Sequence, residues 1–172
     1  MRLEELPSGE RVFVDANIFM YHFSRLSAEC RAFFTRCEAG HIAAFTGVHI
    51  VLDVAHRLMM LEALHKGLIS RGQPVKKLKQ RPEIIRGLED YNTAVQQIPW
   101  MGIKIRPLTS PVIQESERIR RQYGLLTNDS ILVAMMRRMT LTQIVTYDSA
   151  LTNIPDLTIY QPQDISGVVE SV

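Results

Sequence analysis

The sequence predicts an α/β protein in which a central, mostly parallel β-sheet is sandwiched between layers of helices. Short apolar runs that are typical of buried strands alternate along the chain with longer segments of helical periodicity. Strands that alternate with helices are connected as β–α–β units, and such units form parallel sheets. The chain has 172 residues, 46% of them hydrophobic, which suits one domain with a buried core.

The first predicted strand spans residues 11–15, because its central residues are consecutive and apolar. A helix over residues 28–39 follows, with Ser27 as its expected N-cap and Gly40 as its end. Residues 41–45 form the second predicted strand. Together these segments predict the start of a β–α–β arrangement.

A long helix is predicted over residues 47–66, and it ends at Gly67. The following stretch, residues 70–82, is polar and basic and contains two prolines. We interpret it as an exposed connection or as the base of an insertion. A helical insertion around residues 67–100 would then interrupt a single domain formed by residues 1–172.

The second half of the chain repeats the alternation. Ser110 and Pro111 are a typical helix start, with Ser at the cap and Pro at the first position. Thr127 or Asn128 is the expected cap of the next helix. The predicted elements, in order, are a helix over 83–98, a strand over 102–108, helices over 110–124 and 127–139, and strands over 143–146 and 157–160.

Net charge, cysteine spacing and the length of apolar runs narrow the range of protein classes to which the chain could belong. Twenty Lys and Arg against 18 acidic residues give a net charge of +2, which neither indicates nor excludes nucleic-acid binding. Cys30 and Cys37 lie in one predicted helix, roughly 10 Å apart, too far for a disulfide. We therefore expect free thiols and a cytoplasmic location. No apolar run approaches the length of a membrane span.

Four acidic residues lie where one predicted element meets the next, or close to such a junction. Asp15 ends the first strand, Asp148 follows the strand over 143–146, and Asp129 opens a helix. Asp53 lies about two turns into its helix. Helix capping would explain Asp129 and Asp148, and a surface ion pair with Arg57 would explain Asp53. Asp15 directly follows apolar strand residues, so its carboxylate needs hydrogen bonds or a cation.

A shared site would explain all four acids at once. Ligands of parallel α/β sheets bind beyond the carboxyl ends of the strands. Several carboxylates at one place repel each other unless a divalent cation neutralises them, and hard cations such as Mg²⁺ prefer oxygen ligands. A carboxylate-held Mg²⁺ or Mn²⁺ lowers the pKa of a water and clamps a phosphate, which is the chemistry of phosphodiester hydrolysis.

Four segments resemble the PIN-domain nucleases, especially the toxins of VapBC-type toxin–antitoxin pairs. The segments VFVDANIFMY, FTGVHIVLDVAHRL, LLTNDSILVAMM and IVTYDSAL look like the family's four acidic motifs, and they occur in the same order. The resemblance covers about residues 11–160 and implies a PIN-like α/β/α sandwich. It also implies that these motifs form one acidic constellation.

Carried over residue by residue, the resemblance implies three kinds of site residue. The acidic constellation would be Asp15, Asp53, Asp129 and Asp148. Three of these acids, Asp15, Asp129 and Asp148, would hold the metal, and Asp53 would hold it, position it or orient a water. The expected supporting residues are Asn17, Thr146 and Ser130.

The second acid departs from the family pattern. That acid is usually Glu, whereas Asp53 is one methylene shorter. Glu62, about two and a half turns later, is the alternative, although its spacing after Thr46 fits the family poorly. The departure leaves open a non-catalytic PIN-like module that binds RNA or acts as a scaffold.

The resemblance implies a Mg²⁺- or Mn²⁺-dependent endoribonuclease, the toxin of a toxin–antitoxin pair. Water would attack the phosphorus in line and leave 5′-phosphate and 3′-hydroxyl ends. The expected partners are an RNA substrate, a small antitoxin protein and a second copy of the chain. A phosphotransferase with a strand-end Asp nucleophile is a weaker alternative, because Asn17 stands where its second acid would be.

Three basic runs are candidates for contact with an RNA backbone: KKLKQR (76–81), RIRRQ (118–122) and RR (137–138). Solvated helix faces are the alternative for each run. The histidines show no zinc-binding spacing such as H-E-x-x-H, so we expect them to be structural or surface residues.

Overall fold

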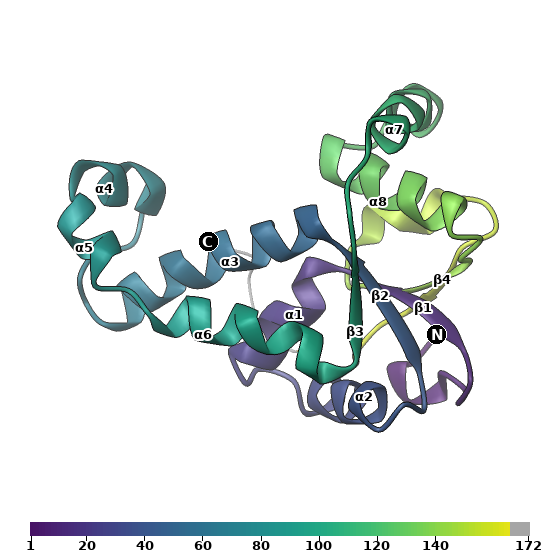
Figure 1. Cartoon of the computed structure of the whole chain (residues 1–172), viewed down its shortest axis with the longest axis horizontal. Coiled ribbons are helices and arrows are strands. Elements are labelled where there is room, and N and C mark those ends of the chain that lie inside the picture. Colours follow the sequence, from purple (N-terminus) through teal and green to yellow (C-terminus); the bar gives the residue numbers. More distant parts are fainter. Residues whose placement is uncertain (166–172) are drawn as a thin grey trace.

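The computed structural model describes residues 1–165, and these contain one five-stranded parallel sheet with the strand order β3-β2-β1-β4-β5 (Figure 1). Every strand pairs with its neighbours in parallel, so the predicted α/β fold with a mostly parallel sheet is confirmed. The strands are β1 (Arg11–Val14), β2 (Ala43–Gly47), β3 (Ile103–Arg106), β4 (Gln143–Val145) and β5 (Thr158–Tyr160).

Helices cover both faces of the sheet. Because parallel crossovers are right-handed, the helices between β1 and β3 lie on one face, and those between β3 and β4 lie on the other. Figure 1 shows α7 and α8 on the side of the sheet away from α1 and α2. The helices are α1 (Ala16–Phe23), α2 (Ala28–Glu38), α3 (Val48–His65), α4 (Pro74–Gln80), α5 (Pro82–Arg86), α6 (Asp90–Gln97), α7 (Ser110–Tyr123) and α8 (Thr127–Arg138), with short 3₁₀ turns η1 (Leu3–Glu5), η2 (Ile98–Met101) and η3 (Ser149–Asn153).

The predicted N-cap of α2 is confirmed, and the N-caps of α7 and α8 are displaced from their predicted positions. Ser27 caps α2 as expected, since its hydroxyl oxygen accepts from the backbone N–H of Cys30 at 2.9 Å. The N-caps of α7 and α8 are Thr109 and Leu126, one residue before the expected positions. Neither makes a side-chain capping bond, and a displacement of one residue is within the usual variation of helix ends.

The region between α3 and β3 is more helical and more broken than the sequence predicts. The expected exposed connection over 70–82 contains α4, and the single helix expected over 83–98 is divided into α5 and α6. Glu62 explains the division, because its carboxylate accepts from the backbone N–H groups of Glu89 and Tyr91 at 3.0 and 2.9 Å. These bonds satisfy amides at the start of α6, so a new helix begins there.

Residues 67–89, which we call the α4–α5 lobe, have a small core of their own. Figure 1 shows the lobe at the end of α3 that points away from the sheet. Buried apolar side chains from α3 and the lobe pack together there: Met60, Ala63, Ile69, Leu78, Ile84 and Leu88. The lobe is therefore a packed structure and not a loose connection.

The main core lies between the sheet and its flanking helices and includes both cysteines. Cys30 and Cys37 are buried and free, as expected, and burial raises the pKa of each thiol to about 12. Such thiols are inert at neutral pH. Among the described residues, no helix combines the length and the apolar character that crossing a membrane requires.

Candidate active site

The sheet has a topological switch point between β1 and β4. From β1 the chain proceeds to β2 and β3 on one side, and later to β4 and β5 on the other. Open α/β sheets bind their ligands at the carboxyl ends of the strands at such a point. Val14 and Val145 are partners in the β1–β4 register, so the residues that follow them, Asp15 and Thr146, lie side by side.

Asp15 is the N-cap of α1 and is held by three hydrogen bonds. One carboxylate oxygen, Oδ1, accepts from the Ala16 N–H at 2.6 Å. The other, Oδ2, accepts from the Thr146 hydroxyl at 2.7 Å and from the Asn17 amide at 3.1 Å. Burial nevertheless raises the pKa of Asp15, with a smaller contribution in the same direction from Asp148. A negative charge on Asp15 is therefore incompletely compensated by the protein.

Thr146 and Asn17 connect the ends of β1 and β4. The fully buried Thr146 hydroxyl donates to Asp15 and accepts from the Asp148 N–H at 3.0 Å and from the Asn17 amide at 3.2 Å. The amide oxygen of Asn17 accepts from the Tyr147 N–H at 3.2 Å. These bonds fix the orientation of the Asp15 carboxylate and the path of the backbone that leads to Asp148.

Asp148 begins the 3₁₀ turn η3. Its Oδ1 accepts from the Ala150 N–H at 2.8 Å, so the capping role that was the alternative explanation is present. Within residues 1–165 the structure shows no hydrogen bond to the other carboxylate oxygen. The cap therefore leaves one oxygen of Asp148 available for a ligand.

Asp129 lies in the first turn of α8 and is influenced by both other acids. Burial, followed by the negative charges of Asp148 and Asp15, raises the pKa of Asp129 to about 6. The negative charges of three acids from distant parts of the chain therefore influence one another in the fold. In the part of the chain that the structure describes, no three His, Cys, Asp or Glu side chains form a ready metal-binding group.

Asp53 makes the ion pair that was its alternative explanation. Its Oδ2 lies 3.0 Å from the Arg57 Nε, one turn later on α3. The Arg57 guanidinium also acts on Asp15, where it opposes the rise in pKa. The positive charge of Arg57 thus acts on Asp15 as well as on Asp53. The i, i+4 spacing of the two residues predicts their ion pair but not the effect of Arg57 on Asp15.

His49 is a second residue near the acids whose position the sequence did not reveal. Burial lowers its pKa to about 4, with partial opposition from Asp53, so the ring is neutral at physiological pH. Neither ring nitrogen has a hydrogen-bond partner among the described residues. The ring packs over Gly47, where a Cβ would lie 2.5 Å from it and 2.8 Å from the Met135 Sδ. Gly47 therefore allows α3 and α8 to approach each other closely.

Glu62 and Ser130, two other candidates from the sequence, form hydrogen bonds with residues other than the coupled acids. Glu62, the alternative second acid, is buried at the base of the α4–α5 lobe and forms an ion pair with Lys66. That bond and the backbone amides at the start of α6 lower its pKa despite burial. Ser130 donates to the Thr127 carbonyl at 2.7 Å and accepts from Arg120 at 3.2 Å, so its hydroxyl joins α8 to α7.

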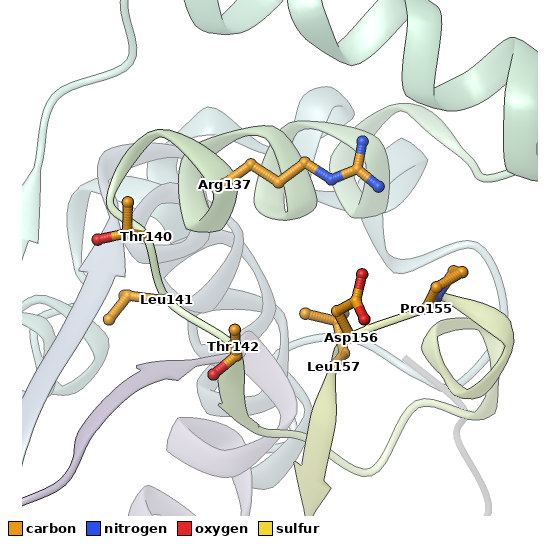
Figure 2. A pocket seen from close by; sticks show the side chains of 7 residues that line it. All are labelled: Arg137, Thr140, Leu141, Thr142, Pro155, Asp156 and Leu157. Carbon is orange, nitrogen blue, oxygen red and sulfur yellow. The ribbon is translucent and has the colours of Figure 1, made fainter.

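Two hollows of the surface have linings that include none of these acids. Figure 2 shows one of about 260 Å³ between the end of α8 and the residues that precede β4 and β5, where Arg137, Thr142 and Asp156 line it. Because the strands are parallel, this is the edge of the sheet opposite to Asp15 and Asp148. A second hollow, of about 380 Å³, lies along α7.

Comparison with known proteins identifies the family. The model of the PIN domain family matches residues 12–157, and the chain therefore belongs to this family. No curated protein sequence matches the chain significantly.

Two solved structures have the same fold. A toxin–antitoxin complex from Klebsiella pneumoniae aligns with a TM-score of 0.51 and 18% identity, covering 86% of this chain and 95% of that one. VapBC2 from Rickettsia felis, bound to a DNA fragment from its promoter, aligns with a TM-score of 0.55 and 13% identity, covering 88% and 98%. At these identities the likeness concerns the fold.

Proposed function

We propose that the protein is a metal-dependent endoribonuclease that hydrolyses RNA phosphodiester bonds. The observation that carries the proposal is the coupling of Asp15, Asp129 and Asp148 at the switch point of the sheet. Protein groups leave these acids only partly neutralised, since the pKa of both Asp15 and Asp129 is raised. Membership of a family that consists generally of nucleases supports the same chemistry.

The donor set fits Mg²⁺ or Mn²⁺. All three acids offer carboxylate oxygens, which hard divalent cations prefer, and mutual repulsion among them favours a cation as their neutralising partner. Asp15, Asp129 and Asp148 would hold the ion. A bound divalent cation would supply charge neutralisation and a more acidic water for attack on phosphorus.

The remaining residues would position these ligands. Thr146 and Asn17 hold the Asp15 carboxylate in one orientation through their hydrogen bonds. The lone pairs that these bonds do not use would then face the metal. Asp53, held by Arg57, would orient a water or add a further ligand. We assign Ser130 a supporting role through the packing of α8, which carries Asp129, against α7.

The biological setting follows from the family and the similar structures. We propose an RNA substrate, a small antitoxin protein as partner and a homodimer in the cytoplasm. Both similar structures are toxin–antitoxin assemblies by their descriptions, which supports an antitoxin partner. We also propose that the family domain is a single unit into which residues 67–100 are inserted.

One observation favours a second function. The Asp53 carboxylate is committed to Arg57, so the second acid of the family pattern is both shorter than usual and ion-paired. A PIN-like module that binds RNA without cleaving it would have such a weakened site.

Cleavage of a generic single-stranded RNA separates the two functions. The nuclease proposal predicts cleavage in Mn²⁺ that stops on addition of EDTA and is lost in Asp15→Asn. Asp156→Asn is a matched control, because Asp156 lies at the opposite sheet edge and its positive φ of 67° suits Asn. Binding without cleavage by the wild-type protein in Mn²⁺ would establish the non-catalytic module instead.

A further inference from the structure

We propose that the α4–α5 lobe binds the phosphate backbone of single-stranded RNA. The choice of RNA as the nucleic acid rests on the proposed function, whereas the lobe's affinity for a polyanion rests on its own charges. The lobe contributes an interaction surface outside the acidic site, and the family pattern of four acids does not include it.

Positive charge is concentrated in the lobe. Residues 67–89 contain six Lys and Arg and two Glu, a net charge of +4. The rest of the chain then has 14 basic and 16 acidic residues, a net charge of −2. The small net charge of the whole protein is thus the sum of two regions of opposite sign. A polyanion is therefore attracted more strongly to the lobe than to the rest of the chain.

Four of the lobe's basic side chains are exposed and have no counter-ion. Within residues 1–165 the structure shows no ion pair and no hydrogen bond from the side chains of Arg71, Lys76, Lys79 or Arg86. The other two basic residues hold the lobe together. Lys77 donates to the Ser70 and Arg71 carbonyls, and Arg81 donates to the Leu68 carbonyl.

In the other basic runs on α7 and α8, most side chains have partners within the protein, although Arg118 has none among the described residues. On α7, Arg121 lies 2.8 Å from Glu117, and on α8, Arg138 lies 3.4 Å from Glu115. Arg137 contacts the ring and hydroxyl of Tyr123. Paired arginines must give up their partners before they bind phosphate, whereas the four free side chains of the lobe lose only water and mobile counter-ions.

The lobe is ordered before any ligand binds. Its buried core and the internal bonds of Lys77 and Arg81 fix the two short helices relative to each other. Lys66 joins the base of the lobe to both Glu62 and Asp90. A prearranged set of charges binds at a lower entropic cost than a flexible basic tail.

An acidic active site needs such a surface. Without a bound cation, Asp15, Asp129 and Asp148 repel phosphate, so attraction for RNA in the metal-free protein has to come from another region. From Asp53 to His65, α3 extends over 12 residues, or about 18 Å, toward the lobe. An RNA that reaches both regions spans several nucleotides, so the lobe would favour long substrates over very short ones.

The test measures binding of a fluorescent, unstructured single-stranded RNA in EDTA, where cleavage cannot interfere. The variant carries Arg71→Gln, Lys76→Gln, Lys79→Gln and Arg86→Gln together. We expect its affinity to fall at least about tenfold at low salt, and the slope of log affinity against log salt to decrease by as much as about 3. Circular dichroism checks that the variant is folded, since all four side chains are exposed.

Two controls accompany this variant. The first control exchanges each of these residues for the other basic amino acid: Arg71→Lys, Lys76→Arg, Lys79→Arg and Arg86→Lys. It keeps the charge and should keep the RNA affinity within about twofold. Removing two paired arginines, Arg121→Gln and Arg138→Gln, should have a clearly smaller effect than removing the lobe charges.

The outcomes separate the two proposals. Unchanged RNA affinity and salt slope in the Gln variant would overturn the lobe proposal, whether or not the protein cleaves RNA. Failure of the wild-type protein to bind RNA, including the case in which the lobe binds only acidic lipid vesicles or an acidic peptide, would overturn it as well. Loss of RNA binding in the Gln variant, together with no cleavage by the wild type in Mn²⁺, would support the lobe and contradict the nuclease.

Discussion

Two regions of the molecule each contain a buried or half-buried acid, and their surroundings shift its pKa in opposite directions. At the base of the α4–α5 lobe, Glu62 receives an ion pair from Lys66 and two backbone N–H bonds, which lower its pKa. At the end of β1, Asp15 also accepts three hydrogen bonds, yet its pKa is raised. The first acid is compensated within the protein, and the second is not.

The difference indicates which acid has a structural role and which has a role in binding. A compensated carboxylate stabilises the fold by holding the start of α6. An acid whose charge is opposed by burial and by neighbouring acids makes the metal-free fold less stable, and a ligand cation can recover that free energy. By this criterion we assign Glu62 a structural role and propose that Asp15 acts together with Asp129 in binding a cation.

The largest expected effect comes from removing the charge of Asp15. Asp15→Asn should reduce RNA cleavage by more than the 10–100-fold that loss of a supporting residue typically costs. The metal-free variant should melt no lower than the wild type at pH 7.5, because the folded state disfavours the charged carboxylate. Cleavage assays and thermal melts in EDTA check the two parts, and a variant that cleaves normally would contradict the assignment.

A smaller effect is expected at Thr146, whose hydroxyl donates to the Asp15 carboxylate. Thr146→Val should lower cleavage and Mn²⁺ affinity about 10–100-fold by releasing the Asp15 carboxylate. Thr46→Val is the matched control, because Thr46 is equally buried and its hydroxyl donates to the Val14 carbonyl and not to an acid. Equal losses of Mn²⁺ affinity in the two variants would assign Thr146 a merely structural role.

Glu62→Gln should show the opposite pattern to Asp15→Asn. We expect a loss of about 1–3 kcal/mol in the free energy of unfolding, since the amide weakens bonds to buried groups, with cleavage retained. The pKa of Glu62 is lowered in the fold, so this contribution is present above its ordinary pKa of 4.5 and is lost as the pH falls through the folded value. Urea unfolding at pH 7 and at pH 4 measures the difference.

The smallest expected effect is the pH dependence that Asp129 gives to the metal-free protein. Its pKa is raised from 3.8 to about 6, so its favourable contribution is present below 3.8 and is lost as the pH rises through about 6. Relative to Asp129→Asn, the wild type should therefore lose stability between pH 4 and pH 7 in EDTA. Asp156→Asn serves as the control.

Adding Mn²⁺ at pH 7.5 should make the wild type more stable than Asp129→Asn, because a metal binds the deprotonated carboxylates. A wild-type protein with the same pH profile as Asp129→Asn, with and without Mn²⁺, would show that Asp129 is not coupled to the other acids.

The sequence reveals those features of the site that depend on short-range pattern. Asp15 can be identified because it directly follows an apolar strand, whereas Thr146 is indicated only by the resemblance to the PIN-domain family. The β1–β4 register then places these two residues side by side, as the parallel sheet requires. Strand ends, and the acids attached to them, can therefore be predicted from the sequence.

Other features depend on contacts between distant residues. The division between α5 and α6 depends on Glu62, which lies 27 and 29 residues from the amides that it binds. The electrostatic influence of Arg57 on Asp15 depends on how α3 crosses the sheet edge. No local pattern contains this information, so the single helix expected over 83–98 is wrong, and the sequence predicts the pair of Arg57 with Asp53 but not its effect on Asp15.

The most direct test of the central claim is a crystal structure of the protein soaked in Mn²⁺, with anomalous diffraction data to locate the metal. The account predicts an anomalous peak at the switch point of the sheet, with oxygen atoms of Asp15, Asp129 and Asp148 in or next to its coordination sphere. A structure in which this position stays empty at a Mn²⁺ concentration that supports RNA cleavage, or in which the metal binds elsewhere, would contradict it.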